Sequence, residues 1–293
     1  MSNKVYDIVT QRILGQLEKV DVNDYSKPWF NIGTSPINIE SKKVYKGINR
    51  IMLSGFESNH FGTFKQWGKR DCKVKKGEKA SPVVKWTFFE DEDTGETKGV
   101  SVRYFNVFNS TQVIGDYARE LESKPLRELN DHKAIKHADE FVHSYLKNER
   151  ITIKHSDIAC HRYSIMSGLT QHIEMPELGQ FKTPQEYYST FFHEITHSTG
   201  AENRLKRAKG KRGTKEYAFE ELIAELGAAF LCADLNLEQT PREDHAIYLK
   251  SWIQALKNDS KFIIQAASKA QKSCDFVHES VNNYQEFLTR KAA

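Results

Sequence analysis

The pattern of hydrophobic and polar positions changes its period along the chain. Over residues 4–19, apolar side chains recur at helical spacing, which predicts an amphipathic helix. Between residues 20 and 115, Gly and Pro separate short runs rich in β-branched and aromatic residues, a pattern typical of strands. Two of these runs, residues 82–89 and 100–108, flank a turn-forming segment at residues 93–96 and together predict a β-hairpin.

The C-terminal half differs, because its apolar residues recur mostly at helical period. A highly charged stretch that contains Lys124 and Pro125 precedes it, and we place a linker near residues 115–132. A chain of 293 residues is long enough for two domains. The pattern therefore predicts an α+β protein, with a mixed α/β domain over residues 1–120 and a mainly helical domain over residues 133–293.

One pentapeptide in the helical half carries the strongest chemical signal. The sequence HEITH at residues 193–197 places His193 and His197 on one face of a helix, where both imidazoles can hold a single Zn²⁺. Gly200 follows at a position where a helix can stop. In zinc peptidases the glutamate of this motif takes a proton from the attacking water, so Glu194 is the candidate general base. The competing interpretation is a helix that carries two histidines by chance.

A catalytic zinc needs a third protein ligand, and a second predicted helix supplies candidates. Over residues 217–233 one face is apolar, and the adjacent face carries Glu221 and Glu225 among small residues that allow close approach to another helix. By analogy with zincin families, we assign Glu221 as the third ligand and Glu225 as a carboxylate that orients a bound histidine. The two roles could be exchanged, and Glu220 is a weaker candidate. The simplest alternative is that all three glutamates are solvated helix residues.

A second signal lies in the N-terminal half, where basic residues crowd a stretch that also contains Phe61 and Phe64. Basic side chains neutralise phosphates and aromatic rings stack on unpaired bases, so the combination suits a single strand of nucleic acid. The same surface would be extended, if the strands form one sheet, by Tyr45, Arg50, Arg103 and Tyr104. The alternative is a solvated basic loop whose aromatic side chains fill the core. The candidate DNA-binding residues are Lys65, Trp67, Lys69, Arg70, Lys73, Lys75, Lys76, Lys79, Lys85 and Trp86.

Composition indicates the cellular compartment of the protein but says little about its function. The formal net charge is only +4, which by itself does not indicate a nucleic-acid partner. The 4 cysteines lie far apart without a C-x-x-C pair, which suits a reducing cytosol and excludes a cysteine-ligated zinc finger. The N-terminus lacks the apolar core of a signal peptide, and no run approaches membrane-spanning length. We therefore expect a cytoplasmic protein with no membrane partner.

Short blocks spread over nearly the whole chain carry a family resemblance, and their order and spacing make it specific. They are residues 28–29, 45–49, 63–66, 74–79, 83–86, 105–109, 173–176, 193–197, 199–200, 204–205, 217–218, 220–231 and 245–248. In these blocks the chain resembles the ArdC-type antirestriction proteins of plasmids and phages. The resemblance implies an N-terminal domain that binds single-stranded DNA and a C-terminal zincin-like metallopeptidase domain with a Zn²⁺ cofactor.

The same resemblance implies that the protein protects incoming DNA from host restriction. One route is proteolysis of a component of the host restriction system, for which Glu194 would be needed. A second route is simple coating of the single strand, in which the zinc would be structural. A third possibility is a protease that acts on proteins crosslinked to DNA, which has the same layout and differs only in its substrate.

Overall fold

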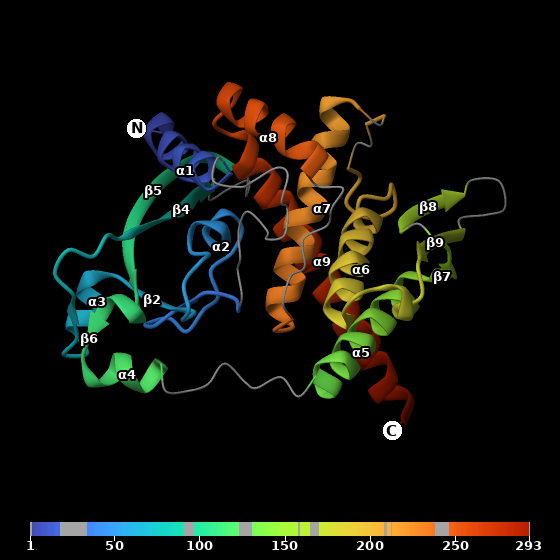
Figure 1. Ribbon diagram of the computed structural model, residues 1–293, viewed down its shortest axis with the longest axis horizontal. Helices are drawn as coiled ribbons and strands as arrows, with labels where there is room; N and C mark the ends of the chain where they lie inside the picture. Colours follow the sequence, from blue (N-terminus) through green and yellow to red (C-terminus); the bar gives the residue numbers. More distant parts are fainter. Residues whose placement is uncertain are drawn as a thin grey trace. The chain divides into compact units, whose positions relative to one another are not determined.

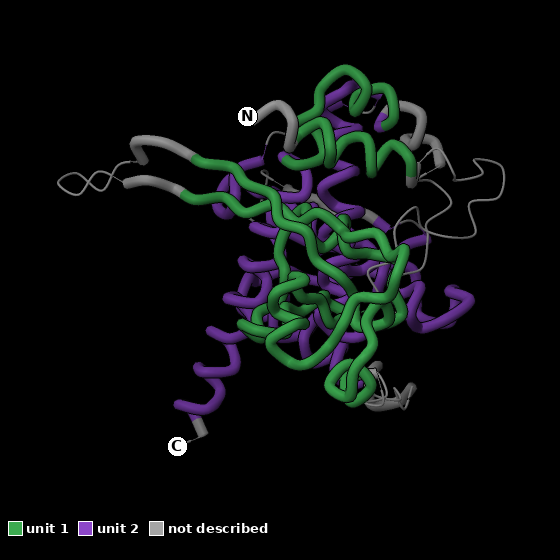
Figure 2. The backbone as a smooth tube through the Cα atoms, turned by 90° about the vertical axis from the view of Figure 1, so that its left-hand side faces the viewer, with its two compact units in different colours: residues 1–20, 29–128, 253–264 green, residues 21–28, 129–252, 265–293 purple. Residues whose placement is uncertain are grey.

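Figure 1 shows the computed structural model, which describes residues 2–17, 34–90, 97–122, 131–157, 159–164, 170–207, 210–211, 213–237 and 246–292. Helices and strands both occur throughout these residues, so the predicted α+β fold class is confirmed. The chain divides into two compact units, which Figure 2 colours separately. Unit 1 comprises Met1–Val20, Trp29–Glu128 and Ile253–Ile264, and unit 2 comprises Asp21–Pro28, Leu129–Trp252 and Gln265–Ala293.

A sheet with the strand order β1-β2-β5-β4 forms the centre of unit 1. Its strands are β1 (Ile37–Asn38), β2 (His60–Gly62), β4 (Ser81–Glu90) and β5 (Thr97–Asn109). β4 pairs antiparallel with residues 97–107 of β5, as the sequence predicts, with a register shift between Phe89 and Glu90. The predicted turn at residues 93–96 lies outside the described residues.

The remaining elements of unit 1 surround this sheet. The α-helices are α1 (Ser2–Leu17), α2 (Ile48–Met52), α3 (Phe64–Gly68) and α4 (Asp116–Glu122). The unit also contains a two-stranded sheet of β3 (Lys73–Val74) and β6 (Val113–Ile114), and the short 3-10 helix η1 (Ser110–Gln112). α4 occupies the first part of the linker predicted near residues 115–132, and its Ala118 and Leu121 are buried in a core cluster with Ile39 and Trp67. Residues 123–130 of that prediction lie outside the described residues. The sequence does not predict α4, because four of its seven residues are charged and the helix is too short to show a clear apolar period.

Residues from the C-terminal part of the chain complete unit 1. The segment Ile253–Ile264 contains the end of α8 (Ala246–Asn258) and the start of α9 (Phe262–Ala292). Thr10 on α1 donates its hydroxyl to the carbonyl of Ser260 at 3.0 Å. The ammonium group of Lys261 lies 5.7 Å from the ring centre of Tyr6, at a distance where a cation and an aromatic face attract.

Unit 2 combines long helices with a three-stranded sheet in the order β7-β9-β8. The described elements are α5 (Asp131–Glu149), β7 (Ile151–His155), β8 (Cys160–Ser164), β9 (Thr170–Met175), η2 (Leu178–Gln180), α6 (Pro184–Thr199) and α7 (Lys215–Asp234), together with most of α8 and α9. β7 pairs parallel with β9, and β8 pairs antiparallel with it. The sequence does not predict this sheet, because polar and charged residues occupy much of its strands.

Helices α6 and α7 pack closely, and their ends carry the expected signals. Thr183 caps α6 by accepting a hydrogen bond from the Glu186 amide, and Gly200 ends the helix as predicted. α7 is buried along most of its length rather than on one stripe. At Gly227 the two helices approach so closely that a Cβ atom would lie 2.5 Å from the side chain of Thr196. Glycine at this position therefore sets the spacing between the two helices.

Candidate metal centre

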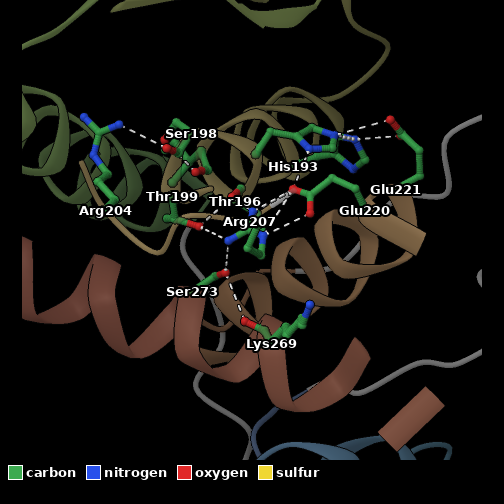
Figure 3. Close-up of polar contacts among 12 residues, drawn as sticks. His193, Thr196, Ser198, Thr199, Arg204, Arg207, Glu220, Glu221, Lys269 and Ser273 are labelled. Atoms are coloured by element: carbon green, nitrogen blue, oxygen red, sulfur yellow. Dashed lines mark hydrogen bonds and ion pairs between the residues drawn. The ribbon is translucent and has the colours of Figure 1, made fainter. Parts of the chain in front are cut away.

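The centre begins with the two histidines of α6, whose ring atoms converge. One helical turn separates His193 from His197, and their Nε2 atoms lie 3.0 Å apart. His193 is 1% exposed, so its ring is shielded from solvent. Figure 3 shows the His193 ring directed toward α7, where the carboxylates of Glu220 and Glu221 lie.

Glu221 completes a three-sided set of donor atoms. Its Oε2 lies 3.4 Å from Nε2 of His193, and its Oε1 lies 3.5 Å from Nε2 of His197. A tetrahedral ion bound at about 2.0–2.1 Å to each donor would separate its ligand atoms by about 3.3 Å. The observed separations match that spacing, and the His193, His197 and Glu221 donor atoms all lie within 4.8 Å of one another. Two imidazoles and one carboxylate in this arrangement fit a divalent metal ion.

The close packing of these groups shifts the pKa values of His197 and Glu221. Burial by itself lowers the pKa of His197, but hydrogen bonds to Glu220 and Glu221 and the nearby charges of Glu194 and Glu221 outweigh it and raise the pKa to about 9. Burial by itself raises the pKa of Glu221, but hydrogen bonds and charges from His193 and His197 hold it far below its ordinary value. Without metal, a proton on His197 therefore balances the Glu221 carboxylate.

Glu220 makes the contact that the sequence assigned to Glu225. The Nδ1 atom of His197 lies 3.3 Å from Oε1 of Glu220, and a carboxylate can only accept this hydrogen bond from the ring. When the ring is neutral, its Nε2 lone pair therefore faces the donor set, and holding a metal-binding histidine in this way is the usual role of a carboxylate behind it. Glu220 is therefore the glutamate that the described contacts place behind a metal-site histidine, a role that the sequence analysis gives to Glu225. Glu225 is buried one turn farther along α7, where its charge acts on Cys232.

Glu194 shares the helix that carries both histidines. Its side chain is 3% exposed, and its negative charge is near enough to raise the pKa of His197. The structure thus brings His193, Glu194, His197 and Glu221 together as the sequence predicts. Arg207, which contacts Glu220, was not predicted, because a single arginine in the loop between two helices carries no periodic signal.

The predicted DNA-binding residues divide into exposed cations and buried aromatics. Trp67 is fully buried, and its Nε1 donates to the carbonyl of Phe108 at 3.1 Å, so its predicted contact with DNA is wrong. Trp86 is half-buried, with its ring centre 6.0 Å from that of Tyr6. Phe61 and Arg50 are also buried. The exposed candidates are Lys65, Lys69, Lys73, Lys75, Lys76, Lys79 and Lys85.

Two of the basic residues are partly neutralised within unit 1. Lys69 lies 3.2 Å from Oε1 of Glu40, and Arg70 lies 2.5 Å from Oε2 of the same carboxylate. Among the described side chains of unit 1, the aromatic residues that face solvent are Phe64, which is 67% exposed, and Tyr104 and Phe105 on β5. Aromatic content alone could not separate these rings from the buried ones, because both kinds occur in the same strand-rich stretch.

Two further features of the described residues bear on membrane spans and disulfides. None of the helices described is both long and apolar enough to cross a membrane. Cys72, Cys232 and Cys274 are buried free thiols. Burial raises the pKa of the Cys232 thiol to about 12, so this thiol stays protonated near neutral pH.

Two known protein families match separate parts of this chain. Residues 3–114 match the family described as the N-terminal domain of anti-restriction factor ArdC, and residues 137–269 match the zincin-like metallopeptidase family. An uncharacterized protein, y4eC, from Sinorhizobium fredii is 36% identical over 99% of this chain and 96% of its own length. Two Escherichia coli proteins named DNA primase TraC are 32% identical over 93% of this chain, which spans only 27% and 20% of their lengths.

Solved structures give the same match in three dimensions. The antirestriction ArdC protein from the R388 plasmid superposes with a TM-score of 0.71 in a metal-free structure, at 33% identity, and this match covers 95% of this chain and 98% of that one. Its Mn(II)-bound structure gives the same TM-score at 32% identity.

Proposed function

Because this chain belongs to the ArdC-type family of antirestriction proteins, we propose that it protects incoming DNA from host restriction as a single-strand-binding zinc peptidase. In this proposal residues 1–120 form the DNA-binding domain and residues 133–293 form the metallopeptidase domain. The protein would act in the cytoplasm, where incoming DNA meets restriction enzymes. The convergence of His193, His197 and Glu221 beside Glu194 is the observation that carries the enzymatic part.

Zinc is the metal that we propose for this site. Two imidazoles favour zinc over manganese, since affinity for nitrogen donors rises from Mn²⁺ toward Zn²⁺ along the first-row metals. Three protein ligands leave an open coordination position, as catalytic rather than structural zinc sites do. The Mn(II)-bound structure of the relative supports binding of a divalent ion by this fold.

The residues of this chain then divide the work of peptide hydrolysis. A bound divalent ion would polarise a peptide carbonyl and lower the pKa of water in the site. Glu194 takes the proton from the attacking water and passes it to the leaving amine. Glu220 holds the His197 ring through Nδ1, at 3.3 Å, so that Nε2 on the other side of the ring faces the donor set. Burial of Glu194 and His193 keeps bulk water away from both groups.

The DNA-binding part of the proposal is supported by unit 1. Exposed lysines there offer charge for phosphates, and Phe64, Tyr104 and Phe105 offer rings for unpaired bases. Lys85 and Arg103 lie directly opposite each other on β4 and β5, so two exposed cations face the same side of the sheet. The similarity to segments of proteins named DNA primases fits work on DNA.

Antirestriction in living cells tests whether the chemistry is needed. Unmodified DNA would be transferred into a restricting host that carries wild-type protein, Glu194→Gln or the His193→Ala/His197→Ala pair. We expect wild type to protect, and both variants to fail while still binding single-stranded DNA. Full protection by Glu194→Gln would reject the peptidase and leave a DNA-coating protein with a structural metal.

A further inference from the structure

Arg207 is a buried cation in the loop between α6 and α7, with a side chain that is only 5% exposed. Its guanidinium grips the carboxylate of Glu220, with Nε lying 3.2 Å and 3.0 Å from the two oxygens and Nη2 lying 2.7 Å from Oε1. It also donates to the Thr196 carbonyl at 2.7 Å, to the Thr199 hydroxyl at 2.7 Å and to the Ser273 hydroxyl at 2.9 Å. One side chain therefore ties α6, α7 and α9 together (Figure 3).

Glu220 faces Arg207 on one side and His197 on the other. The same oxygen, Oε1, lies 2.7 Å from Nη2 of Arg207 and 3.3 Å from Nδ1 of His197. We infer that Arg207 is a positioning residue of the metal centre, which acts through Glu220 to hold His197 with its Nε2 toward the donor atoms. The inference rests on the proposed metal site and concerns a residue that touches neither metal nor substrate.

Arg207 also separates the roles of two neighbouring carboxylates. Glu220 and Glu221 are adjacent in sequence, and both side chains are 8% exposed. Two buried carboxylates near one metal site would repel each other and compete for the ion. The guanidinium neutralises Glu220 and contacts both of its oxygens, so that of these two carboxylates it is Glu221 that faces the two Nε2 atoms. Without Arg207, Glu220 would be free to turn from His197 toward the metal.

The local fold is built around a planar guanidinium rather than a generic positive charge. A Cβ atom on Gly200 would lie 3.0 Å from Nη2 of Arg207, so glycine at the end of α6 leaves room for the group. Lysine carries the same charge but lacks the planar fork that contacts both oxygens of a carboxylate. Arg207→Lys should therefore lose the orientation of Glu220 while it keeps the charge balance.

Arg204 offers a matched control in the same loop. Its side chain is 1% exposed, pairs with Glu149 at 2.6 Å, donates to the Ser198 carbonyl at 3.0 Å and also contacts Gln171. Its ion-pair partner lies on α5 rather than beside a histidine of the metal centre. Loss of Arg204 should therefore weaken the fold much as loss of Arg207 does, without a direct effect on His197.

The experiment measures Zn²⁺ affinity of the full chain by competition with a chromogenic chelator. The proteins are wild type, Arg207→Lys, Arg207→Met, Arg204→Lys, Arg204→Met and the Arg207→Met/Glu220→Gln pair, each with a melting curve. Loss of a group behind a metal ligand weakens metal binding by about 10–100-fold. We expect a loss in that range for both Arg207 variants, and changes within about twofold for both Arg204 variants.

The visible spectrum of the Co²⁺-loaded proteins and the paired variant separate positioning from stability. We expect altered cobalt bands in Arg207→Lys and unaltered bands in Arg204→Lys. Glu220→Gln should restore the melting temperature of Arg207→Met, because no unpaired buried charge remains, while affinity for Zn²⁺ stays low. Equal loss of affinity in the Arg204 and Arg207 variants, in step with their melting temperatures, would overturn the inference. A wild-type chain that binds no Zn²⁺ would instead reject the proposed metal site itself.

Discussion

At the scale of single residues, His197 links the metal-free protein to pH. The pKa of His197 is raised to about 9, above its ordinary value of 6.5, so its proton stabilises the folded metal-free state. This contribution is complete below pH 6.5 and is lost as the pH rises through about 9. A metal ion needs the neutral ring, so metal affinity should rise in the same window, by about tenfold per pH unit for one displaced proton.

Melting curves of chelator-treated protein and Zn²⁺ competition assays, both between pH 6.5 and 9, measure these two opposite trends. His197→Gln supplies the reference, since it removes the titrating group and leaves all other pH effects in place. Relative to that variant, metal-free wild type should lose its thermal advantage as the pH rises. A growing advantage would contradict the assignment of the proton to His197.

Substitutions of Glu220, Glu221 and Glu225 on α7 should differ sharply in their effect on metal binding. Glu221→Gln should lose the most affinity, because its carboxylate faces both Nε2 atoms. Glu220→Gln should cost about 10–100-fold through the ring of His197, and Glu225→Gln should cost less than either. Metal content after dialysis, followed by chelator competition, gives the order. A larger loss for Glu225→Gln than for Glu220→Gln would restore the assignment made from sequence.

At the scale of secondary-structure elements, the distance between α6 and α7 decides whether Glu221 reaches the histidines. Gly227→Ala would place a methyl group 2.5 Å from Thr196 and force the helices apart. We expect a loss of about 1–3 kcal/mol in stability, as for other overpacked cores, together with weaker metal binding. Gly15→Ala is the control, because nothing lies within 4 Å of its added Cβ. That change, within α1, should instead stabilise by about 0.5–1 kcal/mol.

The exposed lysines and aromatic rings of unit 1 lead to a prediction about how the protein binds DNA. Single-stranded oligonucleotide should bind more tightly than duplex, and affinity should fall with salt by a log–log slope of about −0.7 per phosphate contact. Replacing Lys75, Lys76 and Lys79 by Ala should flatten the slope and leave metal content unchanged. Phe64→Ala should weaken binding without lowering the melting temperature, since that ring is 67% exposed. Equal affinity for single and double strands would contradict the proposed strand preference.

Trp67→Ala serves as the opposite case in the same assay. Its ring is fully buried, so the substitution leaves a cavity in a packed core. We expect a stability loss of about 3–5 kcal/mol, seen in a melting curve, and any loss of DNA binding should follow from that loss of structure.

For the molecule as a whole, sequence was informative where chemistry depends on regular spacing. The pair His193 and His197 and the glutamate Glu221 lie at helical intervals on two predicted helices, so their faces could be foreseen. Arg207 could not, because its partner Glu220 is brought to it by the fold of an irregular loop. The β7-β9-β8 sheet was missed because its strands carry many polar residues, and the burial of Trp67 depends on tertiary packing that local pattern does not encode.

The return of residues Ile253–Ile264 to unit 1 has a consequence for protein synthesis. A ribosome adding residues in order exposes α1 and the strands of unit 1 long before it makes Ser260, whose carbonyl receives the hydroxyl of Thr10. Unit 1 can therefore acquire all its parts only when most of the chain has been translated. A fragment ending at Glu128 should melt at a lower temperature than unit 1 in the full chain, and a peptide of residues 253–264 should raise that temperature. No response to the peptide would mean that the N-terminal part is complete without it and can fold as it emerges.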